Sequence, residues 1–402
     1  METNGDRMTV AAAALHEAGR TDAGEVLAGQ VAAELGEKPV DLCVLFASAH
    51  FEDELDRIVA DVHNRLSPRA FIGTTAESVI CNAIEYERRP AVTLWAAHLP
   101  AVHATAFHLS QEDLERLEEP AAWHDHLNLP ADRQPYFVLL ADPFSFNLLE
   151  MLEQIDEAYP GRPAVGGVAS AGEQPGQNIM IFEGQALHHG LCGVALTGNI
   201  EIDTVVSQGC RPIGHHLVIT EGERNVIRQL GGKPPLAVVI ETLKQCSTRD
   251  IELARTGGLL VGRVINEHQP RFTRGDFLIR NPIGFEQESG AMMINDLVRI
   301  GQTIQFHVRD SKSADDDLVS LLGARPRGAA AGALLFTCNG RGSRLFKDRH
   351  HDARAVAQCG NALPVSGMFC AGEIGPVSRR NFLHGHTASV AFLRPAASPP
   401  EA

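Results

Sequence analysis

The sequence is poor in aromatic residues, has no paired cysteine motif and carries less positive than negative charge. Of its 402 residues, 5% are aromatic although 44% are hydrophobic, so we expect a core built mainly from Ala, Val, Leu and Ile. The 35 Lys and Arg residues against 50 Asp and Glu give a formal net charge of −15. Non-specific binding to nucleic acids or anionic membrane surfaces uses clustered cations, so we expect neither partner.

The eight cysteines are spread singly through mostly apolar runs, and none belongs to a C-x-x-C pair. This usage is typical of reduced, buried thiols in a cytoplasmic protein and not of a disulfide framework. The beginning of the chain has no signal-peptide pattern, and no stretch approaches 18 consecutive apolar residues. We therefore expect a cytoplasmic protein without a membrane-spanning segment.

One pattern of segments occurs three times along the chain. Each repeat has an apolar run, an amphipathic helical stretch, a glycine-centred element and a closing apolar run. The first apolar runs are DLCVLFASAHF (41–51), PYFVLLADPFSF (135–146) and GALLFTCNGRG (332–342). The second and third repeats share G-x-x-x-A-G-E, at 167–173 and 367–373. The pattern predicts an α/β (mixed α+β) fold of repeated strand–helix–strand–turn–strand units, which form mixed sheets with packed helices in two domains.

A different pattern separates the second and third repeats. Residues 200–328 contain short alternating runs split by Gly, Asn and Pro, which favours an antiparallel meander. The glycines and prolines of 231–235 indicate a junction. We therefore predict a poorly ordered segment at 1–36, an N-terminal domain with two repeats at 37–232, a C-terminal domain with the meander and third repeat at 233–395, and a tail at 396–402.

Several stretches resemble the FIST family. LFTCNGRGSRLF (335–346), LPVSGMFCAGEIGP (363–376) and HGHTASVAFL (384–393) are similar to its C-terminal part, and VGGVASAGE (165–173) is similar to its N-terminal part. The resemblance makes 37–232 a FIST N-type and 233–395 a FIST C-type domain. It implies a sensory, signal-transduction protein that binds a small molecule, with an amino acid as the favoured ligand and a signalling protein as a possible partner. It implies no catalytic residue and no cofactor.

The residues after the third repeat's first strand form a candidate ligand site. Glycine-rich turns at strand ends expose backbone N–H groups, and an arginine suits a carboxylate. In this interpretation Arg341 and Asn339 hold a small acid, and Glu373 receives an ammonium group. Glu173 is the expected counterpart of Glu373 in the second repeat. The complete candidate set is Cys338, Asn339, Gly340, Arg341, Gly342, Gly372, Glu373 and Glu173. The opposing interpretation is a tight turn whose arginine faces solvent.

Two other functions stay open at this point. One is an enzyme that acts on a small acid and depends on either Cys338 or a metal held by a cluster of histidines. Cys338 could be its nucleophile if a histidine of the third repeat activates it. The 18 histidines include adjacent pairs and His384-Gly385-His386, but no third ligand for a metal is indicated. The third function is a protein-interaction scaffold, as in F-box relatives of the family. We predict no metal ligand and no cofactor, and whether the protein is an enzyme stays undecided.

Overall fold

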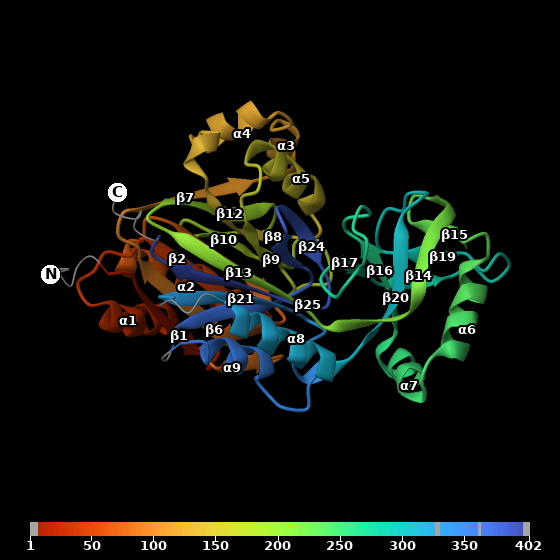
Figure 1. Cartoon of the computed structure of the whole chain (residues 1–402). Helices are drawn as coiled ribbons and strands as arrows, with labels where there is room; N and C mark the ends of the chain where they lie inside the picture. Colours follow the sequence, from red (N-terminus) through yellow and green to blue (C-terminus); the bar gives the residue numbers. More distant parts are fainter. Residues whose placement is uncertain (1–6, 326–329, 361–362, 397–402) are drawn as a thin grey trace. The chain divides into compact units, whose positions relative to one another are not determined.

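The structure is a computed structural model that describes residues 7–325, 330–360 and 363–396 (Figure 1). Its contacts divide the chain into two compact units. The larger unit contains residues up to 206, 319–383 and those from 387 onward, and the smaller unit contains 207–318 and 384–386. In the described residues, no helix has the length and apolar character needed to cross a membrane. The sequence domains proposed above are defined differently from these contact units, and their boundaries stay predictions.

Three six-stranded mixed sheets form the larger unit. Sheet one has the order β1 (Thr9–Leu15), β6 (Val92–His98), β2 (Leu42–Ser48), β3 (Phe71–Ala76), β10 (Met180–Phe182) and β11 (Gln185–Leu187). Sheet two has the order β24 (Arg380–His384), β23 (Glu373–Val377), β9 (Ala164–Val168), β8 (Tyr136–Ala141), β12 (Leu191–Gly198) and β7 (Val102–Leu109). Sheet three has the order β13 (Glu201–Gln208), β25 (Thr387–Arg394), β21 (Gly332–Cys338), β22 (Val365–Cys370), β4 (Ser78–Cys81) and β5 (Ile84–Glu87). The predicted fold class, an α/β fold of mixed sheets with packed helices, is confirmed.

Each sheet combines a parallel pair of strands with a hairpin from another repeat. The parallel pairs are β2–β3, β8–β9 and β21–β22. The hairpin β4–β5 of the first repeat joins sheet three, β10–β11 of the second joins sheet one, and β23–β24 of the third joins sheet two. This exchange links every repeat to both others, and it brings residues of β5 beside the third repeat.

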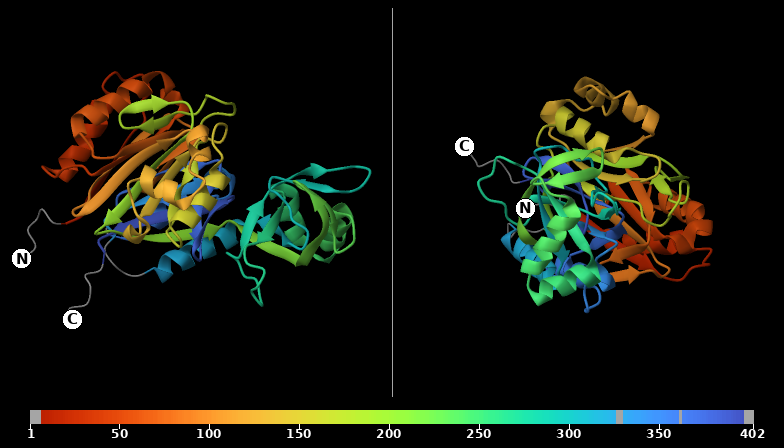
Figure 2. Two further views of the ribbon diagram at one scale, coloured as in Figure 1. Left: turned by 90° about the horizontal axis from the view of Figure 1, so that it is seen from above. Right: turned by 90° about the vertical axis from the view of Figure 1, so that its right-hand side faces the viewer.

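Helices cover the outer faces of the sheets, while the inner faces share one apolar core. The helices of the larger unit are α1 (Ala23–Leu35), α2 (Leu55–Leu66), α3 (Gln111–Glu115), α4 (Pro120–His126), α5 (Leu148–Ala158) and α9 (His351–Ala357), with short 3₁₀ turns at 49–54, 131–133 and 342–344. Phe46 of β2, Leu140 of β8 and Phe336 of β21 all lie in the shared core. In Figure 2 the β10–β11 hairpin lies beside the red helices, and β11 contacts α2.

The segment before residue 37 contains β1 and α1, which differs from the poorly ordered segment expected there. The Ala-rich strand β1 pairs antiparallel with β6 along its whole length. The helix α1 buries Leu27 and Val31 and packs on α2. Its alanines give little hydrophobic signal in the sequence, but they allow close packing that stabilises the segment through tertiary contacts.

The smaller unit is built on one antiparallel sheet, as its alternating pattern predicts. Its seven strands are β17 (Phe277–Arg280), β16 (Leu259–Val264), β20 (Thr303–Arg309), β14 (Cys210–Glu223), β15 (Val226–Leu230), β19 (Met292–Ile294) and β18 (Pro282–Phe285). Two helices that the pattern did not suggest, α6 (Pro235–Gln245) and α7 (Thr248–Gly257), interrupt the strands. The helix α8 (Ser311–Ala324) begins in this unit and continues into the larger one.

A glycine marks the centre of each parallel strand pair. The register pairs Leu45 with Gly73, Leu139 with Gly166 and Leu335 with Gly367. A Cβ atom on these glycines would lie 2.2, 1.8 and 1.9 Å from the carbonyl oxygen of the paired leucine. These positions therefore require glycine, because the paired backbones approach closely. In the second repeat the glycine at this position is Gly166, one residue before the Gly167 that the motif suggested.

We expect Gly367→Ala to lower the free energy of unfolding of the larger unit by about 1–3 kcal/mol, because its methyl group has no space. The matched control is Gly323→Ala in α8, where an added Cβ meets no atom within 4 Å. That change is expected to raise stability by about 0.5–1 kcal/mol. Urea unfolding monitored by tryptophan fluorescence measures both variants, since Trp95 and Trp123 are buried in the larger unit. Equal stabilities would contradict the steric argument.

Candidate functional site

The turn that follows β21 is held by the exchanged hairpin of the first repeat. Ser343 donates to Glu87 from its backbone N–H at 3.0 Å and from its hydroxyl at 2.5 Å. Arg344 donates through both terminal nitrogens to Glu77, at 2.7 and 2.8 Å. Gly342 has a φ of +57°, and a Cβ there would meet Phe369 at 2.7 Å, which fixes this position as glycine. The turn is therefore a defined structure between two repeats.

Arg341 points inward from this turn and binds Asp352 of α9. Its side chain is 1% exposed, and it donates to the two carboxylate oxygens of Asp352 at 2.6 and 2.8 Å. Asp352 also accepts from the Thr337 hydroxyl at 2.7 Å and lies 2.9 Å from Nδ1 of His351. Burial alone would raise the pKa of Asp352, but the charge and hydrogen bonds of Arg341 hold that pKa well below its ordinary range. The solvent-facing arginine of the opposing interpretation is not what the structure shows.

Glu373, the first residue of β23, is completely buried beside this ion pair. Its Oε2 accepts from the backbone N–H of Thr387 at 3.0 Å, and its side chain hydrogen-bonds to that of Cys338. Burial raises the pKa of Glu373 to about 8, although the charge of nearby Arg341 acts in the opposite direction. The raised pKa favours the protonated form of this carboxyl group.

Three buried polar atoms of the candidate residues have no hydrogen-bond partner in the described part of the chain. They are Oδ1 of Asn339, Nη1 of Arg341 and Oε1 of Glu373. Leaving such an atom unsatisfied costs about 1–3 kcal/mol, so a bound molecule or water is the ordinary explanation for a group of them. Asn339 and Arg341 follow β21 and Glu373 begins β23, so these elements supply two acceptors and one cationic donor.

The remaining candidate residues near β21 have backbone roles. Cys338 is 9% exposed, and its Sγ accepts from the Gly340 N–H at 3.4 Å. The carbonyl oxygen of Gly372 accepts from the N–H of Val168 in the neighbouring repeat, at 2.9 Å. Asn339 donates its N–H to the carbonyl of Cys370. These bonds hold the strand ends together.

Glu173 does not occupy the place equivalent to Glu373. It lies in an exposed loop after β9, where its backbone N–H donates to Gln177 at 2.8 Å. Glu373 instead pairs with Gly167 inside sheet two. The shared A-G-E motif therefore begins a strand in the third repeat and a loop in the second, because the second repeat has a longer connection before its hairpin.

Sequence reasoning missed two buried acidic residues, Asp352 beside Arg341 and Glu85 near Asp352. Asp352 lies in a weakly amphipathic helix, and Glu85 lies on a hairpin from another repeat. Glu85 is 1% exposed and accepts from the N–H of Ala353 at 3.0 Å. Burial, followed by the nearby charge of Asp352, raises the pKa of Glu85 to about 7. In the sequence, the His-His-Asp stretch at 350–352 is the one unusual feature at the start of α9.

His350 and His351, two histidines of the third repeat, bond to Glu85 and Asp352. His350 Nδ1 accepts from the backbone N–H of Glu85 at 3.0 Å. His351 stacks on Phe346 with 3.5 Å between ring centroids and contacts Asp352. Among the residues that the structure describes, no three His, Cys, Asp or Glu side chains are placed to hold a metal ion.

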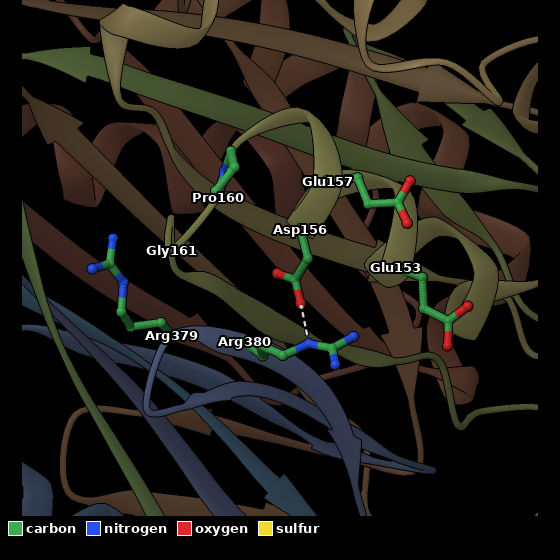
Figure 3. A pocket seen from close by; sticks show the side chains of 7 residues that line it. All are labelled: Glu153, Asp156, Glu157, Pro160, Gly161, Arg379 and Arg380. Carbon is green, nitrogen blue, oxygen red and sulfur yellow. Dashed lines mark ion pairs between the residues drawn. The ribbon is translucent and has the colours of Figure 1, made fainter. Parts of the chain in front are cut away.

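An open surface pocket of about 330 Å³ lies elsewhere on the larger unit, between the last turns of α5 and the turn of the β23–β24 hairpin (Figure 3). Asp156 accepts from the Asn381 amide group at 2.6 Å and forms an ion pair with Arg380 at 3.7 Å. Glu153, Glu157 and Arg379 are exposed to solvent. These contacts attach the exchanged hairpin to α5 and pair the charges of Asp156 and Arg380.

Comparisons with known proteins agree with the resemblance seen in the sequence. The FIST N domain family matches residues 41–233, and the FIST C domain family matches residues 235–376. An uncharacterized protein of Mycobacterium bovis is 37% identical over 369 residues, which cover 91% of this chain and 94% of the relative. An uncharacterized protein of Mycobacterium tuberculosis is 38% identical over 355 residues, which cover 88% and 91%.

Among solved structures, a cyanuric acid hydrolase is similar with a TM-score of 0.37 and 9% identity, covering 97% of this chain and all of that chain. This similarity is too low to support an argument about fold or function.

Proposed function

The chain belongs to the FIST family, whose domains are sensory and commonly bind small ligands, and from this premise we propose that it binds an amino acid or a small carboxylic acid at the strand ends of the third repeat. The observation that carries the proposal is the group of three unpartnered atoms on Asn339, Arg341 and Glu373. A carboxylate of the ligand would accept from Nη1 of Arg341, while a donor group would bind the two oxygens. We further propose that the protein acts in the cytoplasm on a signalling partner.

The guanidinium group of Arg341 is already partly bound by another residue. Asp352 already holds Nε and Nη2 of Arg341, so only Nη1 is available to a ligand carboxylate. This arrangement fixes the plane of the guanidinium before binding, which lowers the entropy cost of recognition. The Cys338 enzyme alternative receives less support, because His350 and His351 bond to Glu85 and Asp352.

We expect one member of a panel of amino acids and small carboxylic acids to raise the melting temperature of the protein. A ligand at 100 times its dissociation constant stabilises the folded state by about 2.7 kcal/mol, which corresponds to roughly 4–5 °C for a unit as large as this one. Differential scanning fluorimetry at pH 7.5 measures the shift.

Two variants locate this effect without breaking the Arg341–Asp352 pair. Asn339→Ala and Glu373→Gln are expected to fold but to lose most of the shift, because each removes one unpartnered acceptor. Glu37→Gln, an exposed residue, is the matched control and keeps the full shift. A shift that survives in both site variants would place the ligand elsewhere, and a panel without any shift would contradict the proposal.

A further inference from the structure

Glu373 occupies a position that the other two repeats fill with apolar side chains. The first strand of each exchanged hairpin pairs with the residue that follows the central glycine of its host sheet. In this register Val79 pairs with Met368, Met180 pairs with Thr74, and Glu373 pairs with Gly167. All three hairpin residues are completely buried. An apolar residue is therefore sufficient for packing at this position, and the carboxyl group of Glu373 serves a purpose other than packing.

Among the residues that the structure describes, the charge of this carboxyl group has no dedicated partner. Arg341 is the nearby cation, but Asp352 holds it through two hydrogen bonds. The other groups that face Glu373 are the thiols of Cys338 and Cys370 and both the backbone N–H and the hydroxyl group of Thr387. The N–H binds Oε2, and Oε1 has no partner among the described residues. Burial without a counter-charge favours the protonated acid, which agrees with its raised pKa of about 8.

We propose that a cationic group of the bound molecule, such as an ammonium group, sits at Oε1 of Glu373 and displaces the proton of this carboxyl group. The inference rests on the proposed function, since it assigns the chemistry and the regulation of the same site. An opposite charge within about 4–6 Å stabilises the carboxylate, so the proton leaves to solvent while the ammonium group keeps its own. The reaction is protein-COOH plus R-NH₃⁺ giving the ion-paired complex plus H⁺.

The size and sign of the proton exchange follow from the ionisation of the ligand-free acid. With a pKa of about 8, roughly 0.9 of the carboxyl groups carry a proton at pH 7 and roughly 0.1 at pH 9. Binding should therefore release about 0.9 proton per molecule at pH 7 and almost none at pH 9. The affinity rises nearly tenfold from pH 6 to pH 7 and levels off above pH 8.

Isothermal titration calorimetry of the full chain in two buffers of different ionisation enthalpy, phosphate and Tris, measures the released proton directly. The probes are pairs of one skeleton: glycine with glycolate, L-alanine with L-lactate, and L-glutamate with 2-hydroxyglutarate, together with the amines ethylamine and putrescine. We expect an amino member to bind with about 0.9 proton released at pH 7 and its hydroxy partner to bind at least tenfold more weakly. Binding of an amine alone with the same proton release also supports the inference and assigns the ligand to the amines.

Glu373→Gln is expected to weaken binding at least tenfold and to abolish the proton release, while Glu37→Gln changes neither. The wild-type buffer comparison decides the question even if the Glu373→Gln variant folds poorly. A hydroxy acid that binds as tightly as its amino partner, without proton release, would overturn this inference and leave the proposed function intact. If no probe binds the folded protein, the proposed function fails as well.

Discussion

Asp352→Ala is expected to lower the free energy of unfolding of the larger unit by about 3–5 kcal/mol. The change leaves the Arg341 guanidinium buried at 1% exposure without its counter-charge, and an uncompensated buried charge carries a cost of this size. It also removes the acceptor of the Thr337 hydroxyl. Urea unfolding followed by the fluorescence of Trp95 and Trp123 measures the loss, because both indoles are buried in this unit.

Two controls separate the missing charge from general damage. Asp348→Ala, at an exposed position four residues earlier, should change stability by no more than about 0.5 kcal/mol. The double change Arg341→Met with Asp352→Leu should be less destabilising than Asp352→Leu alone, because it leaves no unpaired charge. If the double variant is less stable than the single one, the cost lies in packing and the electrostatic explanation is wrong.

The repeat pattern predicted most strands and helices of the larger unit, because the sequence signals that mark them are local. A buried strand ends at small or polar residues, and a central glycine permits close approach of the paired backbone, as Gly367 does against Leu335. Both signals are visible in a single sequence. The same reasoning directed attention to Arg341 and Glu373, which carry two of the three unpartnered buried atoms at the strand ends. Whether they bind a ligand stays a prediction.

The exchange of hairpins lies beyond the reach of local patterns. Strands as short as Met180–Phe182 contain too few residues to specify which sheet they join. Their place is set by packing between segments that are distant in the sequence, such as the pairing of Ile181 with Gly73. The contacts of Glu77 and Glu87 with the turn after β21, and that of Glu85 with α9, depend on this exchange and could not be predicted from the residues around them.

The error about Glu173 has the same origin. The motif A-G-E is identical in two repeats, yet only in the third does Glu373 begin a strand that enters a neighbouring sheet. The number of residues between the central glycine and the hairpin decides which side chain enters the core. In the second repeat this connection is longer, so Met180 takes the buried position and Glu173 stays in the exposed loop.

Glu373→Gln is expected to make the larger unit progressively more stable than the wild type as the pH rises from 5 to 8. The folded pKa of about 8 lies above the ordinary value of 4.5, so the folded state keeps a proton that the unfolded chain has already lost. The wild type therefore loses stability through this window, by about 3–5 kcal/mol in all, and the loss stops above pH 8. Glutamine keeps the shape of the protonated acid and cannot ionise, so the variant escapes this loss.

Urea midpoints from tryptophan fluorescence at pH 5, 6, 7, 8 and 9 test this expectation, with the difference between variant and wild type as the measured quantity. Glu85→Gln provides a second curve, whose difference should stop growing near pH 7 and reach about 3 kcal/mol, because the pKa of Glu85 is raised only to about 7. If the two stability differences stop growing at different pH values, the two buried carboxyl groups have different pKa values. Curves parallel to that of the wild type would mean that Glu373 is ionised in the folded protein, and the proton needed for ligand exchange would then be absent.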